Sequence, residues 1–388
     1  MRELSEIKIV FYNMKLKELL QHPMLILPKN WKSLGYSSYY TCVLEEGEKY
    51  IKLLGELDES ELHGRHQFIG EISKESLISV SRSFLKMVCD ILQCYLEEGN
   101  PHKAYNILHN GLAQRYDSIL LMSFLEFNYL YPANYRLRVK EGRAELGDLF
   151  HVPFESRHIV ESCRYSIPGY PTLYLSNSVY LAYKELGDPD YDNLYVSKYC
   201  FTRSVNRVET LLDMRNTPLW GNCVGYQYKF LARWILVMAC SIKVAHPKAP
   251  FKEEYILPQI LLQWVKNNIY SGGRKTIGVC YSSTKIIDRD AGYYGHFYNT
   301  AIPILHSKKE GYCDTLSELF VMTRPIGFHE ALKHSGEVSN QSQVKSIQIA
   351  GTAVEYIETD FGKIEQVLSE PCSELYYVNG NKVNGINT

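Results

Sequence analysis

The sequence predicts an α+β fold with a helical N-terminal region, and two observations indicate it. Apolar residues recur at helical spacing in the first third of the chain, whereas short strand patterns and helical patterns are mixed after residue 130. The mixture lacks the regular βαβ rhythm of a doubly wound sheet. We therefore expect a mostly helical region at 1–130, a mixed domain at 131–333, and a linker with a small β-rich C-terminal extension at 334–388.

The region between residues 73 and 130 has the pattern of packed helices. Ser73 is a suitable N-cap for a helix. Residues 77–95 then carry apolar side chains at intervals of three and four, which form one face of an amphipathic helix. Pro101 is expected to begin a second helix as its first residue. The apolar stretch 119–130 is predicted to complete a helical bundle.

Strands and helices are then predicted in mixed order, with turn residues between them. Strands are expected at 135–138, 172–175, 195–201 and 276–281, and helices at 178–186, 227–244 and 254–268. The polar segment 334–343 is predicted to be a linker. Beyond it, strands are expected within 346–357 and 375–386, with a tight turn at Asn379-Gly380.

The composition is that of a globular protein, with 45% hydrophobic and 22% charged residues. Basic and acidic residues number 42 and 43, so a nucleic-acid-binding surface is not expected. No Cys-x-x-Cys pair or secretory signal peptide is recognised, and the apolar run Trp234–Ile242 is too short to span a bilayer. We expect a cytoplasmic protein with free thiols, no metal site and no membrane contact.

The most informative chemical pattern lies between Arg164 and Glu185. The arginine precedes a Pro-Gly turn, a short strand carries Tyr174, and the following helix brings Glu185 two turns later. A guanidinium suits a diphosphate, and a tyrosine ring suits a flat heterocycle. A carboxylate suits a positive charge that develops on a sugar ring in the transition state. We expect these three groups to converge on one site.

The segment 164–185 resembles the core of the RES domain, a family named for its arginine, glutamate and serine. Asp148–Phe154 is also similar to a stretch of longer RES proteins. The resemblance covers residues 130–305 and implies an ADP-ribosyltransferase-like fold. It further implies an enzyme that degrades NAD, in studied members by phosphorolysis and often as a bacterial toxin.

The resemblance leaves two of its site positions open between neighbouring residues. The earlier arginine of the family corresponds to Arg136 or Arg138, which alternation places on the same side of a strand, and Arg136 is slightly favoured. The late serine corresponds to Ser283, with Ser282 as the alternative. Asn299 is a weaker correspondence.

The resemblance implies cleavage of the nicotinamide–ribose bond of NAD, with inorganic phosphate as co-substrate and no further cofactor. Arg164 and one of the earlier arginines would hold the diphosphate, and Tyr174 would pack against nicotinamide or its ribose. Glu185 would stabilise the oxocarbenium-like transition state, oriented by Ser283. Water or a protein side chain as acceptor would instead give a glycohydrolase or an ADP-ribosyltransferase. A site that only binds a nucleotide or a partner is the alternative from another class.

An enzyme that drains NAD has to be restrained in its own cell. The resemblance therefore implies an antitoxin or regulatory partner and a role as a toxin or phage-defence effector. The helical region 73–130 has two interpretations: a restraining, sensing or homo-oligomerising module, or a packing extension that covers one sheet face.

Overall fold

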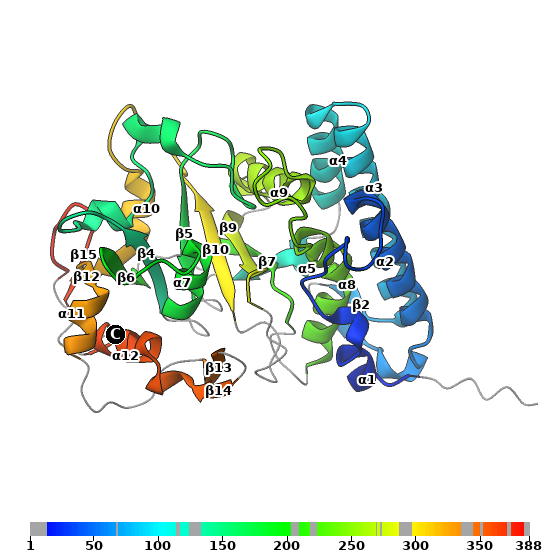
Figure 1. Ribbon diagram of the computed structural model, residues 1–388. Helices are drawn as coiled ribbons and strands as arrows, with labels where there is room; N and C mark the ends of the chain where they lie inside the picture. Colours follow the sequence, from blue (N-terminus) through cyan, green and yellow to red (C-terminus); the bar gives the residue numbers. More distant parts are fainter. Residues whose placement is uncertain are drawn as a thin grey trace, which may run out of the picture.

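A central β-sheet with helices packed against it organises the chain (Figure 1). The computed structural model describes residues 14–66, 69–113, 117–123, 133–202, 209–217, 223–268, 270–271, 274–286, 297–334, 344–349, 352–370 and 374–383. In Figure 1 the N-terminal helices, blue to cyan, stand on one side of the sheet, and the C-terminal elements, orange to red, lie toward the other.

The sheet collects strands that lie between residues 121 and 376. They are β3 (Leu121–Ser123), β4 (Asn134–Val139), β5 (Thr172–Ser176), β6 (Leu194–Phe201), β7 (Glu209–Met214), β8 (Tyr270–Ser271), β9 (Arg274–Ser282), β10 (Tyr298–Pro303), β11 (Phe320–Thr323), β12 (Ile326–Gly327) and β15 (Leu375–Tyr376). Their order is β15-β11-β6-β4-β5-β10-β9-β7-β3, with β12 on β6 and β8 on β9. Among these described strands only β7 and β9 pair in parallel. The predicted α+β class is confirmed, as are the four strands expected between residues 135 and 281.

The N-terminal helices share one hydrophobic core with a face of the sheet. The N-terminal helices are α1 (Leu16–Leu20), α2 (Tyr39–Gly55), α3 (Lys74–Leu96), α4 (Pro101–Ala113) and α5 (Asp117–Leu120), beside a hairpin of β1 (Arg65–His66) and β2 (Gly70–Glu71). Two later helices, α8 (Val224–Cys240) and α9 (Ile256–Asn267), lie on the same side of the sheet (Figure 1). As predicted, Ser73 caps α3 by accepting a hydrogen bond from the N–H of Ser76. The core runs from these helices to Leu212 of β7, Val279 of β9 and Ala301 of β10. The helices are therefore a structural part of the fold around the sheet.

For two of the predicted helices on this side of the sheet, the predicted C-terminal end is wrong. Leu121–Ser123 forms a strand that pairs with β7, because a short apolar run fits either structure and the edge of β7 offers backbone partners. Residues 124–132, which include the predicted domain boundary, lie outside the described residues. Helix α8 ends at Cys240 instead of Val244, because carbonyls at this end accept hydrogen bonds from Arg164.

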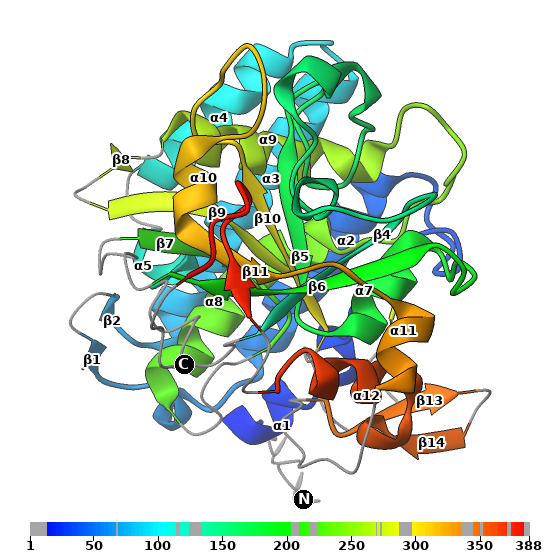
Figure 2. The same cartoon turned by 90° about the vertical axis from the view of Figure 1, so that its left-hand side faces the viewer.

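The remaining described helices lie toward β4, β6 and β11. They are α7 (Val179–Leu186), α10 (Asp314–Leu319), α11 (Phe328–Lys333) and α12 (Asp360–Val367). Between α11 and α12 the chain forms a hairpin of β13 (Ser346–Ile349) and β14 (Thr352–Glu355). Helices α7, α11 and α12 share an apolar cluster with β4 and β6. In Figures 1 and 2, α12 and the hairpin lie below α7. The C-terminal extension thus packs on the domain that carries the sheet.

The C-terminal extension matches its prediction in part. The hairpin confirms the strands expected within 346–357, and a φ of 87° at Gly380 confirms the tight turn. Helix α12 was not predicted, because its segment is polar and carries few apolar residues. It begins where Thr359 accepts a hydrogen bond from the N–H of Gly362. Residues 335–343 of the predicted linker lie outside the described residues.

His151 is fully buried beside aromatic rings that include Phe150 and Tyr312. Its Nδ1 lies 2.7 Å from the carbonyl oxygen of Val152, and its Nε2 accepts a hydrogen bond from the N–H of Cys313 at 2.9 Å. These partners require a neutral ring with the proton on Nδ1. Burial lowers the pKa of His151 to about 4.

Protonation of His151 is expected to weaken the fold below pH 6.5. Because its pKa is about 4 in the folded chain and about 6.5 when unfolded, the unfolded chain binds a proton in this window that the folded chain does not. The free energy of unfolding should therefore fall by about 2 kcal/mol from roughly pH 6.5 to 5 through this residue. Urea denaturation across this range measures the effect. His151→Gln should reduce the pH dependence, and an unchanged dependence in this variant would count against the interpretation.

Candidate active site

Glu185 lies near the end of α7, a helix whose limits are set by its own sequence. Ser178 begins it by accepting a hydrogen bond from the N–H of Leu181, and Gly187 ends it with a φ of 86°. The side chain of Glu185 is 33% exposed. The C-terminal end of a helix carries partial negative charge, so a carboxylate there needs donors or cations from other elements.

Side chains from two neighbouring strands donate hydrogen bonds to the same oxygen of Glu185. Ser283 Oγ and Asn299 Nδ2 each lie 2.8 Å from Glu185 Oε1. Asn299 is itself oriented by Ser176, whose hydroxyl donates to Asn299 Oδ1 at 2.6 Å across the register of β5 and β10. With its oxygen engaged, the amide presents its NH₂ group to Glu185. One carboxylate oxygen is thereby fixed, and the structure brings three sequence-predicted residues together.

Lys285 lies beside the second oxygen of Glu185, and the sequence patterns did not identify it. Its Nζ is 3.9 Å from Glu185 Oε2 and donates to the backbone oxygen of Glu185 at 2.8 Å. Its backbone N–H donates to Ser283 Oγ at 3.1 Å, so that hydroxyl accepts from Lys285 and donates to Glu185. The side chain of Lys285 is 47% exposed. A single loop lysine belongs to no periodic pattern or motif, which explains why it was missed.

The geometry distinguishes Ser283 from Ser282. Ser282 is the last residue of β9 and Ser283 follows it, and successive side chains along an extended chain point to opposite sides. Ser282 Oγ accepts a hydrogen bond from the N–H of Asn216 at 2.9 Å, whereas Ser283 contacts Glu185. Ser283 is therefore the serine next to the carboxylate, and Ser282 connects β9 to the segment that follows β7.

Arg164 caps the C-terminal end of α8. Its Nη1 donates to the carbonyl oxygen of Cys240 at 2.8 Å and its Nη2 to that of Ile242 at 3.0 Å. A cation is favourable at this end of a helix. Nη2 also lies 3.5 Å from the hydroxyl of Thr284, directly after Ser283. Arg164 is 9% exposed, and both of its terminal nitrogens already donate hydrogen bonds to backbone carbonyls. Arg164 therefore connects the end of α8 to the segment that contains Ser283.

Tyr174 belongs to an aromatic group on the sheet face that carries Ser176 and Asn299. The three side chains share this face because Tyr174 and Ser176 are two residues apart on β5, and Ser176 lies opposite Asn299. Tyr174 Oη donates to the backbone oxygen of Tyr165 at 2.7 Å, and the rings of Tyr165 and Tyr281 lie 4.3 Å apart. Burial raises the pKa of Tyr174 well above its ordinary value, so its hydroxyl stays protonated.

Arg136 and Arg138 lie two residues apart on β4 and contact different elements. The strands β4 and β5 share one register pair, Tyr135 with Ser176. Beyond it, the backbone oxygen of Tyr174 accepts a hydrogen bond from Arg136 Nη1 at 2.9 Å. Arg138 Nη1 instead donates to the backbone oxygen at position 148, at 3.1 Å. Of the two arginines, the structure therefore brings Arg136 to the strand that carries Tyr174.

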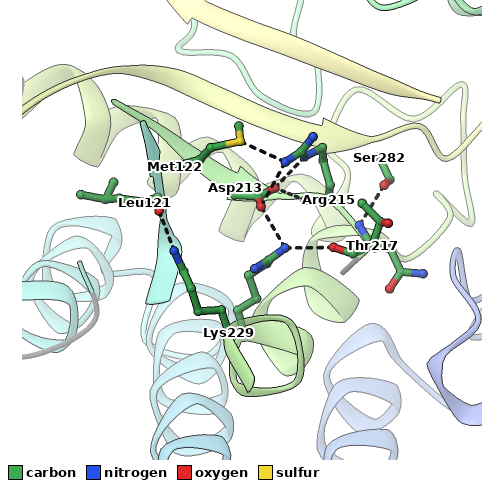
Figure 3. A network of polar contacts seen from close by, with 9 residues as sticks. Leu121, Met122, Asp213, Arg215, Thr217, Lys229 and Ser282 are labelled. Carbon is green, nitrogen blue, oxygen red and sulfur yellow. Dashed lines mark hydrogen bonds and ion pairs between the residues drawn. The ribbon is translucent and has the colours of Figure 1, made fainter. Parts of the chain in front are cut away.

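A second polar cluster, centred on Asp213, was missed from the sequence (Figure 3). Arg215 Nε lies 2.8 Å from Asp213 Oδ1, and Arg233 Nη2 lies 2.9 Å from Asp213 Oδ2, with each side chain at most 3% exposed. Burial acts to raise the pKa of Asp213, but the two arginines outweigh it and lower the pKa to about 2. Asn216 follows Arg215, and its backbone N–H donates a hydrogen bond to Ser282 Oγ at the end of β9. The cluster therefore joins α8 and β7 to β9, the strand that leads into the site.

The described ranges hold no group of three or more His, Cys, Asp or Glu side chains that could ligate a metal ion. Among the same residues, no helix combines the length and apolar character needed to cross a membrane.

Comparison with known proteins places the chain in a family. No family model and no solved structure matches it. It is similar to a protein of Bacillus subtilis (strain 168) named "Putative toxin YopC", with 31% identity over 312 residues. The aligned part covers 76% of this chain and 69% of that protein. This identity over most of both chains shows that the chain belongs to the family of Bacillus subtilis YopC.

Proposed function

We propose that the chain is a toxin that cleaves the bond between nicotinamide and ribose in NAD, on a RES-type core related to the ADP-ribosyltransferase fold. The name of the relative supports the toxin role. The observation that carries the enzymatic proposal is the arrangement of Glu185. Ser283 and Asn299 hold one of its oxygens, and the second oxygen of this partly exposed carboxylate lies 3.9 Å from the Nζ of Lys285.

In the proposed reaction the carbon–nitrogen bond breaks and its electron pair leaves with nicotinamide. Positive charge then develops on the ribose, and the carboxylate of Glu185 stabilises this charge more strongly than the ground state. The ring of Tyr174 supports the planar nicotinamide. An oxygen of inorganic phosphate forms the new bond to the ribose carbon, which gives nicotinamide and ADP-ribose 1″-phosphate.

The contacts of the arginines and of Lys285 suggest that they have different roles in NAD binding. Arg164 and Arg136 already donate to backbone carbonyls, so we assign them mainly to holding the site in place. Lys285 is 47% exposed and adjoins Glu185, so it is the cation best placed to meet phosphate oxygens of the substrate. This assignment differs from the expectation that Arg164 itself holds the diphosphate.

Product analysis tests the proposed function. Purified full-length protein is mixed with NAD, with and without inorganic phosphate, and the products are identified by mass spectrometry. Phosphate-dependent release of nicotinamide together with ADP-ribose 1″-phosphate is expected. Free ADP-ribose formed without phosphate would move the reaction to hydrolysis, and an ADP-ribosylated protein would move it to protein modification. Intact NAD under all conditions would contradict the enzymatic proposal and favour a binding module.

Removing the Lys285 side chain is expected to weaken substrate binding more than turnover. Because one charge-assisted hydrogen bond is lost, KM for NAD should rise by about tenfold in Lys285→Ala, while kcat changes less. Lys285→Arg should recover most of the affinity. Lys308→Ala is a matched control, since Lys308 is a 43% exposed lysine that pairs with a carboxylate outside the site. An unchanged KM in Lys285→Ala would remove this lysine from the binding site.

A further inference from the structure

The first turn of α7 is satisfied mainly by residues from the C-terminal extension. Backbone N–H groups in the first turn of a helix have no partner within the helix. The N–H of Leu181 donates to Ser178, the helix's own cap. The N–H of Val179, however, donates to Glu365 Oε1 at 2.7 Å, and that of Tyr180 donates to Tyr356 Oη at 3.3 Å. Both acceptors come from residues after position 350.

Glu365 and Tyr356 form a buried pair at this position. Tyr356 Oη donates to Glu365 Oε1 at 2.6 Å, and the two residues are 0% and 5% exposed, in the order Tyr356 and Glu365. A buried carboxylate is costly unless it is compensated. Here the positive end of the α7 dipole and the N–H of Val179 compensate it. Because the buried carboxylate of Glu365 is stabilised only where it meets the first turn of α7, this contact fixes the position of α12 on α7.

Aromatic contacts extend this attachment along α7. The ring of Phe361 on α12 lies 5.2 Å from that of Tyr180 and 5.1 Å from that of Tyr183. Both tyrosines precede Glu185 on the same short helix. Since α7 spans only Val179–Leu186, a rotation at its first turn would displace Glu185 from Ser283 and Asn299.

We infer that Glu365 is a positioning residue for Glu185, acting through α7, and that the C-terminal extension is therefore part of the catalytic unit. The inference rests on the proposed function and deepens it. Glu365 does not approach the substrate, because it lies at the first turn of α7 and Glu185 lies near the other end. Figures 1 and 2 show α12 next to α7 in both views.

The test compares full-length variants by two independent measurements. Glu365→Ala removes the acceptor, Glu365→Gln keeps an oxygen for the N–H of Val179, and Tyr356→Phe keeps the packing but removes the hydroxyl. Glu358→Ala is the control, an exposed glutamate in the same extension. Hydrogen exchange of the α7 amides measures how firmly the first turn of α7 is held, and this measurement does not require enzymatic activity. Steady-state kinetics with NAD measure the effect of the same contact on the site.

In Glu365→Ala, faster exchange at Val179 and Tyr180 is expected, together with a loss of about 10- to 100-fold in kcat and little change in KM. Glu365→Gln should restore most of kcat, and Tyr356→Phe should show a smaller loss. Unchanged exchange in α7 would overturn the inference, as would faster exchange with unchanged kcat. Inactive wild-type protein would instead contradict the proposed function, and hydrogen exchange would still decide whether Glu365 holds α7.

Discussion

Glu185→Gln is expected to lower NAD turnover by about 100- to 1000-fold while the protein stays folded. Glutamine has the shape of glutamate, so its oxygen can still accept hydrogen bonds from Ser283 and Asn299. The negative charge that would stabilise the developing cation on the ribose is lost. Because this interaction strengthens in the transition state, the loss should fall on kcat and leave KM within a few-fold of wild type.

Nicotinamide release measures the effect of Glu185→Gln, and thermal unfolding confirms that the variant is folded. Induced expression in a bacterial host adds a second readout, in which the variant should be tolerated. Glu330→Gln is a suitable control, since Glu330 is an exposed glutamate on α11. A Glu185→Gln variant as active and as toxic as wild type would remove Glu185 from the mechanism and favour a non-catalytic binding role.

Asp213→Asn is expected to cost about 3–5 kcal/mol in the free energy of unfolding. The substitution removes the negative charge that Arg215 and Arg233 share in the protein interior, where these side chains are 0% and 2% exposed. The two guanidinium groups would then repel each other without the compensating carboxylate. The segment that leads from β7 to Ser282 should loosen as a consequence.

Urea denaturation at neutral pH measures the effect of Asp213→Asn. Asp314→Asn is the matched control, because Asp314 pairs with Lys308 at the surface and is 69% exposed, so its loss should cost less than about 1 kcal/mol. Combining Asp213→Leu with Arg215→Met and Arg233→Met should recover much of the stability, since apolar residues can replace a buried ionic group. A loss below about 1 kcal/mol in Asp213→Asn would show that the carboxylate does not balance the two arginines.

The elements that the sequence predicts well are those whose limits depend on neighbouring residues. Ser73 and Ser178 begin helices because each hydroxyl reaches an N–H three residues later, and Gly187 ends α7 because glycine readily adopts a positive φ. Leu121–Ser123 could not be predicted in this way. Its strand conformation depends on pairing with β7, which lies far along the chain.

The candidate site divides along the same line. Glu185 is 98 residues from Ser283 and 114 from Asn299, so local pattern alone could not bring them together, and the family resemblance was needed to name them. Their hydrogen bonds depend on strand register. The engagement of Arg164 depends on where α8 ends, and the place of Lys285 depends on a loop, so neither was accessible from spacing or periodicity.

The hydrophobic core that joins the N-terminal helices to the sheet limits how this protein can be divided. A fragment that begins at β4 would keep α8 and α9 but lose α2, α3 and α4, which pack against them. The apolar face of α8 and α9 would then meet water, and such surfaces promote aggregation. Shortened versions should therefore become insoluble before their chemistry can be measured. A minimal version of this protein has to keep these helices.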